Sequence, residues 1–117
     1  GADVADAAFL VLLSAGSIEE SASPADAVSY ARDKGWLSQE IEGSQTITFG
    51  RFSYLMMEVH GESGGIMYSL IPGPRYAARE AVFQGWSRRQ IAPGDEISGE
   101  TAVRVLGNYL AAKGEQG

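Results

Sequence analysis

Apolar residues recur along this chain at the spacing of one helix face in several separate segments. In one segment they fall at i, i+3, i+4 and i+7: Phe52, Leu55, Met56 and Val59. Similar patterns, bounded by polar caps, glycines and prolines, predict four further helices. The five expected helices cover residues 4–15, 24–34, 49–60, 74–84 and 99–112. The pattern of apolar positions therefore predicts an all-α protein.

Polar residues at the ends of these segments support the expected boundaries. Ser23 and Asp26 are spaced as a capping box, and Pro24 suits the first position of a helix. Thr48 and Ser98 precede the third and fifth segments, where a hydroxyl group can accept a hydrogen bond from a free helical N–H. Turn-forming residues mark two of the intervening loops, at 43–45 and 93–95.

Part of the sequence repeats itself after 50 positions without a gap. The shared residues are Pro24 and Pro74, Ala27 and Ala77, Ala31 and Ala81, Gly35 and Gly85, Trp36 and Trp86, Ile47 and Ile97. A fixed period of this size indicates a supersecondary unit that is used more than once. We expect two helix–loop–helix units, about 23–60 and 73–112, which pack with the helix at 4–15 as a single bundle over 1–117. We also expect 24–60 and 74–110 to superpose.

A Gly-Trp pair follows the first helix of each unit. Gly35 and Gly85 are placed to take the left-handed conformation that ends a helix. Trp36 and Trp86 are then expected to fold back on their own helices and to join the core. The alternative is that their indole faces stack on the sugar rings of a ligand.

Composition and charge exclude several classes of function. The net charge of −6 argues against nucleic acid binding, which needs a basic surface. The chain has no cysteine, which excludes disulfides and thiolate metal sites. No apolar run reaches about 18 residues, so no membrane span is expected. Residues 1–62 carry ten acidic and three basic side chains, whereas 63–117 carry five and six. The basic residues of this second part are mostly arginines: Arg75, Arg79, Arg88, Arg89 and Arg104.

One segment, 61–65, fits the Gly-x-Ser-x-Gly pattern of a serine nucleophile. Ser63 would need a strand-to-helix elbow and a well-placed histidine base. The chain has one histidine, His60, only three residues before it, and the preceding residues have a helical period. We therefore expect the helix to end at His60, near its dipole, and a glycine-rich loop to follow. No enzymatic activity is expected.

An acidic group before and at the start of the fifth helix is a candidate calcium site. Asp95, Glu96 and Glu100 lack the alternating acids of a calcium-binding loop, and capping and solvation of the fifth helix account for them. We expect neither a metal ion nor a cofactor.

The two units resemble S-layer homology (SLH) repeats over 23–60 and 73–112, about two-thirds of the chain. Each has an alanine-spaced helix, a glycine-bounded stop, a loop, an Ile-Thr or Ile-Ser start and a second amphipathic helix. The family's binding motif, Ile-Thr-Arg-Ala-Glu, is altered, because Phe49 and Gly99 stand at the arginine position and Glu100 comes one place early. The chain is also similar to spirochaete envelope proteins that join such a region to an OmpA-like domain.

The family normally has three units, and two are clear here. The helix at 4–15 is interpreted as a remnant of another unit, because Ala8, Leu12 and Gly16 match the spacing of the alanines and the glycine in the first helix of a unit. We also expect the chain to be a piece of a longer protein.

The resemblance implies a non-catalytic attachment module of a bacterial cell envelope, periplasmic and associated with the outer membrane. Its partner would be peptidoglycan or a cell-wall polysaccharide. The alternative is a protein–protein scaffold of the same fold that binds an envelope protein and has lost glycan binding. A ligand groove is expected between the repeats, with five candidate residues: Arg51, Tyr68, Arg75, Tyr76 and Arg79. The arginines among these candidates would form charge-assisted hydrogen bonds with an anionic group of the ligand. The alternative is that these arginines only lie on a solvated helix face.

Overall fold

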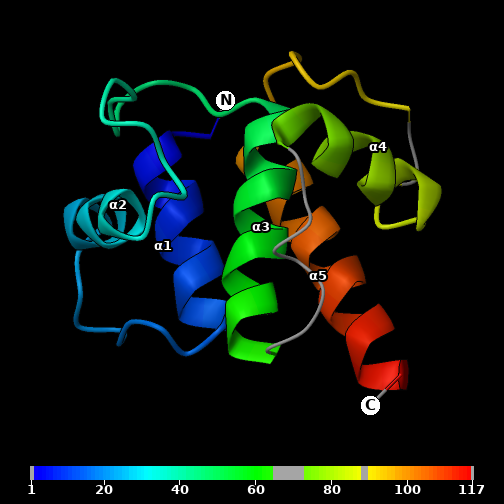
Figure 1. Ribbon diagram of the computed structural model, residues 1–117, viewed down its shortest axis with the longest axis horizontal. Helices are drawn as coiled ribbons and strands as arrows, with labels where there is room; N and C mark the ends of the chain where they lie inside the picture. Colours follow the sequence, from blue (N-terminus) through cyan, green and yellow to red (C-terminus); the bar gives the residue numbers. More distant parts are fainter. Residues whose placement is uncertain (1, 65–72, 88–89, 117) are drawn as a thin grey trace.

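The computed structural model describes residues 2–64, 73–87 and 90–116, and these residues form an all-α bundle (Figure 1). Its helices are α1 (Val4–Ser14), α2 (Pro24–Asp33), α3 (Phe49–Gly64), α4 (Pro74–Phe83) and α5 (Gly99–Gln116). All five predicted helices are confirmed. Their starts agree with the predicted starts, and α1, α2 and α4 end within one residue of the predicted ends. Within the described ranges, β-pairing is limited to two isolated bridges, Asp3–Thr46 and Thr48–Glu96.

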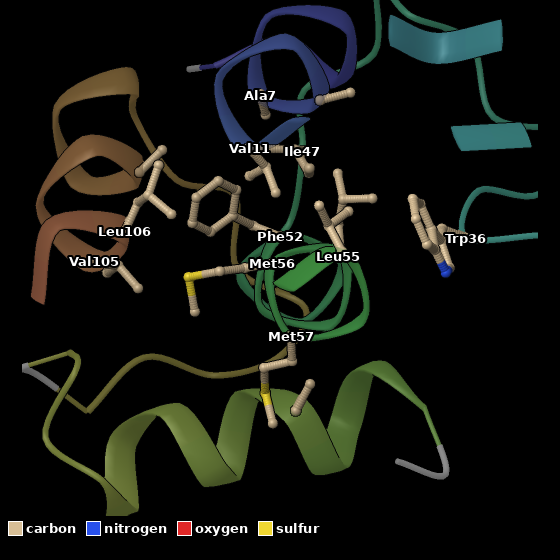
Figure 2. Close-up of a cluster of buried hydrophobic side chains, with 14 of the residues drawn as sticks. Ala7, Val11, Trp36, Ile47, Phe52, Leu55, Met56, Met57, Val105 and Leu106 are labelled. Atoms are coloured by element: carbon tan, nitrogen blue, oxygen red, sulfur yellow. The ribbon is translucent and has the colours of Figure 1, made fainter. Parts of the chain in front are cut away.

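Three helices form the centre of the bundle and two lie outside it. Figure 1 shows α1, α3 and α5 running side by side from the same end of the molecule, with α2 and α4 on the outside. Helix α2 packs on α1, α4 packs on α3, and α1 contacts both α3 and α5. Figure 2 shows how α3 fills the middle, with Met56 pointing towards α5 and Met57 towards α4. The inner helices can all start at one end because each outer helix and its loops lead the chain back.

A ring of backbone hydrogen bonds joins the segments that precede the three inner helices. The Ile47 N–H donates to the Ala2 carbonyl (2.8 Å), the Ile97 N–H to the Ile47 carbonyl (3.2 Å), and the Ala2 N–H to the Ile97 carbonyl (3.0 Å). Each segment thus donates to one neighbour and accepts from the other. The three inner helices therefore start at equivalent places, and corresponding residues lie 45 positions apart between α1 and α3 and 50 apart between α3 and α5.

This register changes the interpretation of the N-terminal helix. The spacing of Ala8, Leu12 and Gly16 matched α1 to the first helix of a unit, but α1 starts from the same hydrogen-bonded ring as α3 and α5, which are second helices. The sequence pattern was misleading because small residues and a terminal glycine suit any closely packed helix. Gly16 does end α1 in the left-handed conformation, with φ of 74°.

The two Gly-Trp stops have the same backbone geometry. Gly35 and Gly85 have φ of 80° and 82°, which an L side chain adopts only with strain. The N–H groups of Trp36 and Trp86 each donate to the alanine carbonyl five residues earlier, at 2.9 Å. Both indoles are buried in the core, with 9% and 8% of their surface exposed. The core position thus accounts for both tryptophans.

The predicted caps and turns are present. Ser23 and Asp26 form a reciprocal capping box, with bonds of 3.1 and 3.0 Å. Thr48 and Ser98 accept the N–H three residues on, at 3.3 and 3.1 Å. The turns at 43–45 and 93–95 are each closed by a 3.1 Å backbone bond from the N–H of the third residue. The caps at Thr48 and Ser98 and the two turns recur 50 residues apart, so the sequence repeat is also present in the local structure at these places.

A candidate ligand groove on the second unit

A groove of about 700 Å³ lies between α4 and the loop at 90–95. Arg75, Arg79 and Phe83 line it from the helix, and four-residue spacing places all three on one face of α4. Ala77 and Ala81 belong to the buried face of the same helix, which packs on α3. The alternation of small buried and large exposed residues therefore turns the two arginines outward into the groove.

The opposite wall of the groove is fixed by the start of α3. The Phe49 N–H donates to the Asp95 carbonyl (2.8 Å) and the Gly50 N–H to the Pro93 carbonyl (2.9 Å). The Asp95 carboxylate accepts the Ala92 N–H (3.3 Å), which keeps the turn closed. These hydrogen bonds thus fix the shape of the loop that forms the groove wall.

The groove combines positive charge with an exposed aromatic ring. Neither Arg75 nor Arg79 forms an ion pair with another described residue, and both side chains are exposed. Phe83 is 82% exposed, so its ring is open to a ligand in the groove. Asp95 adds a carboxylate at the loop side. The arrangement suits a ligand that has an anionic group next to a flat apolar or sugar face.

The structure brings only some of the predicted site residues together. Arg75 and Arg79 share the groove, whereas Arg51, half-buried in the first turn of α3, and Tyr76, 44% exposed on α4, do not line it. Successive residues on a helix point about 100° apart, so Tyr76 leaves the face that Arg75 occupies. Tyr68 lies outside the described residues.

Sequence reasoning missed Phe83, Gln90, Pro93 and Asp95 as groove residues. The four-residue interval from Arg79 could have identified Phe83 as a member of the same face. The loop residues carry no such signal, because their position depends on how the loop folds back on α3 and α4.

A smaller groove of about 500 Å³ lies at the corresponding place in the first unit. It is formed by the start of α1, by α2 and by the turn at 43–44. Asp3, just before α1, and Asp6 on α1 line it on one side, and Arg32 lines it from α2. The Arg32 guanidinium donates to the Ile41 carbonyl, so part of its hydrogen-bonding capacity is already used.

Helix α3 corrects the interpretation of the Gly-x-Ser-x-Gly segment. The helix continues to Gly64, so residues 61–64 form a helical turn and not the expected glycine-rich loop. Packing of the preceding turns carries a helix through residues of low propensity, since tertiary contacts supply most helical stability. Ser63 therefore lies inside a helix, whereas a nucleophile elbow joins a strand to a helix.

His60 is a buried side chain between helices and is not at a helix end. Its Nε2 atom lies 3.0 Å from the Ser14 Oγ atom, and its ring packs edge-on against Tyr109 at 5.3 Å. The Ser14 hydroxyl donates its one proton to the Val11 carbonyl (2.7 Å), so it meets the imidazole as an acceptor. The expected interaction with the helix dipole is wrong, because α3 continues for a full turn beyond His60.

Two findings on metal binding and membrane insertion hold for residues 2–64, 73–87 and 90–116. There, no three His, Asp or Glu side chains gather closely enough to hold a metal ion. The Glu100 carboxylate pairs with the Arg104 guanidinium at 2.6 Å. Within the same ranges, every helix is too short or too polar to cross a lipid bilayer.

Comparisons of the chain with protein-family models, with curated proteins and with solved structures give no significant match. The SLH resemblance therefore rests on the residues at the helix boundaries and on the 50-residue period.

Proposed function

We propose that this domain is a non-catalytic attachment module of a bacterial cell envelope, located in the periplasm, that binds peptidoglycan or a cell-wall glycan. The ligand lies in the groove between α4 and the loop at 90–95. The observation that carries the proposal is the pair of guanidinium groups, Arg75 and Arg79, which face one groove together with the exposed ring of Phe83.

The chemistry of a wall polymer suits these three side chains. Carboxylate or phosphate groups of the polymer accept charge-assisted hydrogen bonds from Arg75 and Arg79. The face of a sugar ring is apolar enough to pack on Phe83, and Asp95 can accept hydrogen bonds from sugar hydroxyls. The acidic first half of the chain repels the same polymer, so binding is directed to the second unit.

Binding at this groove is expected to be weak and sensitive to salt. Exposed ion pairs contribute only about 0–1 kcal/mol each, and about 0.15 M salt screens charges beyond roughly 8 Å. In a longer protein, a second wall-binding site would raise the overall affinity through effective concentration. A weak single site is therefore compatible with attachment.

Sedimentation with purified peptidoglycan at low and high salt tests the proposal. We expect the wild-type domain to be retained at low salt and released at high salt. An Arg75→Ala, Arg79→Ala double variant should be retained roughly tenfold less, as expected for the loss of about 1.4 kcal/mol. Arg104→Ala is the control, because it removes an exposed positive charge outside this groove.

Two outcomes would contradict the proposal. Equal retention of the double variant and the wild type would exclude the arginines as the binding residues. No retention of the wild type at any salt concentration would instead support the alternative, a protein–protein scaffold of the same fold.

A further inference from the structure

Helix α5 differs from the other two inner helices in what covers its outer side. Helix α2 packs on α1 and α4 packs on α3, but no described helix takes the corresponding place on α5. Three residues of this side are apolar and exposed, Val103 (57%), Leu110 (38%) and Ala111, and Gly107 lies between them. We call these four residues the α5 outer face.

The register set by the ring of backbone hydrogen bonds identifies the residues of α1 and α3 that correspond to the α5 outer face. Val103 corresponds to Ser53 of α3 and to Ala8 of α1, and all three positions would be equally buried if the bundle were covered evenly. Ser53 and Ala8 are fully buried. At the next turn Met57 points towards α4 (Figure 2). Met57 is 2% exposed, whereas its counterpart Gly107 is exposed. The α5 outer face is therefore open where α1 and α3 are closed.

The covering helices define the chemistry of a suitable occupant. Both α2 and α4 are ten residues long and start with proline. Both bury two alanines four residues apart, Ala27 with Ala31 and Ala77 with Ala81, which lets the backbones approach closely. At the edge of the α5 outer face, Glu100 and Arg104 pair with each other, so no net charge is offered there. The face thus suits an apolar, alanine-lined helix and not a charged ligand.

We propose that the α5 outer face is a docking site for a short alanine-faced helix carried by a partner protein. This inference is independent of glycan binding, because α5 contributes nothing to the groove on α4. The two surfaces also differ in salt dependence. Docking on the apolar face persists at high salt, whereas binding to the arginines is lost.

A fluorescent peptide with the sequence of residues 73–87 tests the proposal, because it has the required chemistry. A hydrocarbon staple at positions 75 and 79 keeps it helical on the side away from its alanines. We expect saturable binding to the full chain, little change in affinity at high salt, and amide NMR shifts that map to α5. A Val103→Lys, Leu110→Lys variant should bind at least tenfold more weakly.

Matched controls separate docking from other effects. Ala25→Lys, Gln39→Lys adds the same charge at exposed positions elsewhere and should bind as the wild type does. The same peptide with lysines in place of Ala77 and Ala81 should bind at least tenfold more weakly. Urea unfolding of the Val103→Lys, Leu110→Lys variant should match the wild type, because both positions are exposed.

Several results would overturn the proposal. One is no saturable binding of the stapled peptide, and another is equal binding to the Val103→Lys, Leu110→Lys variant, as expected if the peptide only displaced α4. A wild-type dimer in sedimentation equilibrium that this variant abolishes would show that a second copy of the chain covers the face instead.

Discussion

The two grooves of this protein have the same backbone plan but different side chains. In each unit the turn is closed by a bond from its own side chain, because Gln45 Oε1 accepts the Glu42 N–H (2.7 Å) and Asp95 Oδ2 accepts the Ala92 N–H (3.3 Å). The glycine stop and the buried tryptophan also recur. The side chains that line the two grooves differ.

Charge is the main difference between the grooves. Arg75 and Arg79 of the second unit correspond to Ala25 and Ser29 of the first, which cannot bond an anion strongly. The first groove has Asp3 and Asp6 beside it and is smaller. The comparison teaches that the glycine stops and the buried tryptophans are shared between the units, whereas the groove residues at positions 25 and 75 and at 29 and 79 have diverged. The second groove is the one equipped for an anionic ligand.

The largest expected effect comes from the shared tryptophans. Replacing Trp36 or Trp86 with alanine should lower the free energy of unfolding by roughly 3–5 kcal/mol, because each leaves a large cavity in the core. Trp86→Ala should cost more, because the Trp86 ring packs edge-on against Tyr109 at 4.7 Å, whereas the Trp36 ring lies 6.2 Å from that of Tyr30. Urea unfolding measures both. A loss below roughly 1 kcal/mol with ligand binding abolished would place the residue in the ligand site instead of the core.

The close contact between loop and inner helix is built differently in the two units. A Cβ atom on Gly50 would lie 3.0 Å from the Pro93 carbonyl oxygen, and a Cβ atom on Gly43 would lie 3.1 Å from the Ala5 Cβ atom. The glycine is thus on the helix in the second unit and on the loop in the first. Gly50→Ala should cost roughly 1–3 kcal/mol in urea unfolding, because it overpacks the contact.

The first unit offers a compensation test of the same contact. Gly43→Ala alone should be destabilising, and Ala5→Gly added to it should restore part of the loss by moving the glycine to the helix, as in the second unit. Strictly additive effects of the two substitutions would argue against a shared contact.

The two outer helices differ in their N-terminal caps. Helix α2 has Ser23 as its cap, whereas α4 starts after Gly73 with no side-chain bond. Ser23→Ala should lower the free energy of unfolding by about 1 kcal/mol. Thermal and urea unfolding of the variant measure this loss. An unchanged midpoint would show that packing of α2 on α1 holds the helix start without the cap.

Transfer of the arginines tests whether the second groove owes its function to charge alone. Ala25→Arg, Ser29→Arg should give the first groove the same pair of guanidinium groups. We expect a few-fold gain in peptidoglycan retention at low salt, because exposed ion pairs are individually weak. If the new arginines added more peptidoglycan retention than Arg75 and Arg79 provide in the second groove, Phe83 would contribute little to binding.

The smallest expected effect on the free energy of unfolding comes from Tyr54. Burial raises its pKa above the usual 10.0, and the Glu58 carboxylate adds to the shift, so the fold favours the neutral phenol. The resulting stability is present below pH 10 and is lost as the pH rises through the higher folded-state pKa. Between pH 9 and about 11, the free energy of unfolding should fall less in Tyr54→Phe than in the wild type. Parallel curves for the two proteins would contradict this.

Local signals in the sequence determined much of the fold. The helix starts, the capping box, the left-handed Gly35 and Gly85 and the turn positions involve atoms within about five residues of one another, and such interactions can be inferred from residue type and spacing. The pairing of Arg75 with Arg79 on one face follows from helical period in the same way. These local features can therefore be inferred from the sequence without knowledge of the tertiary packing.

Only the tertiary structure decided how the pieces combine. The His60–Ser14 contact joins residues 46 positions apart, and Asp95 reaches the groove because its loop bonds to the start of α3. The correspondence of α1 with α3 and α5 depends on a ring of bonds between three distant segments. The continuation of α3 beyond His60 depends on packing that overrides the low helical propensity of glycine. Interactions of this kind leave no periodic signal, because the residues that make them are brought together only when the whole chain closes into the bundle.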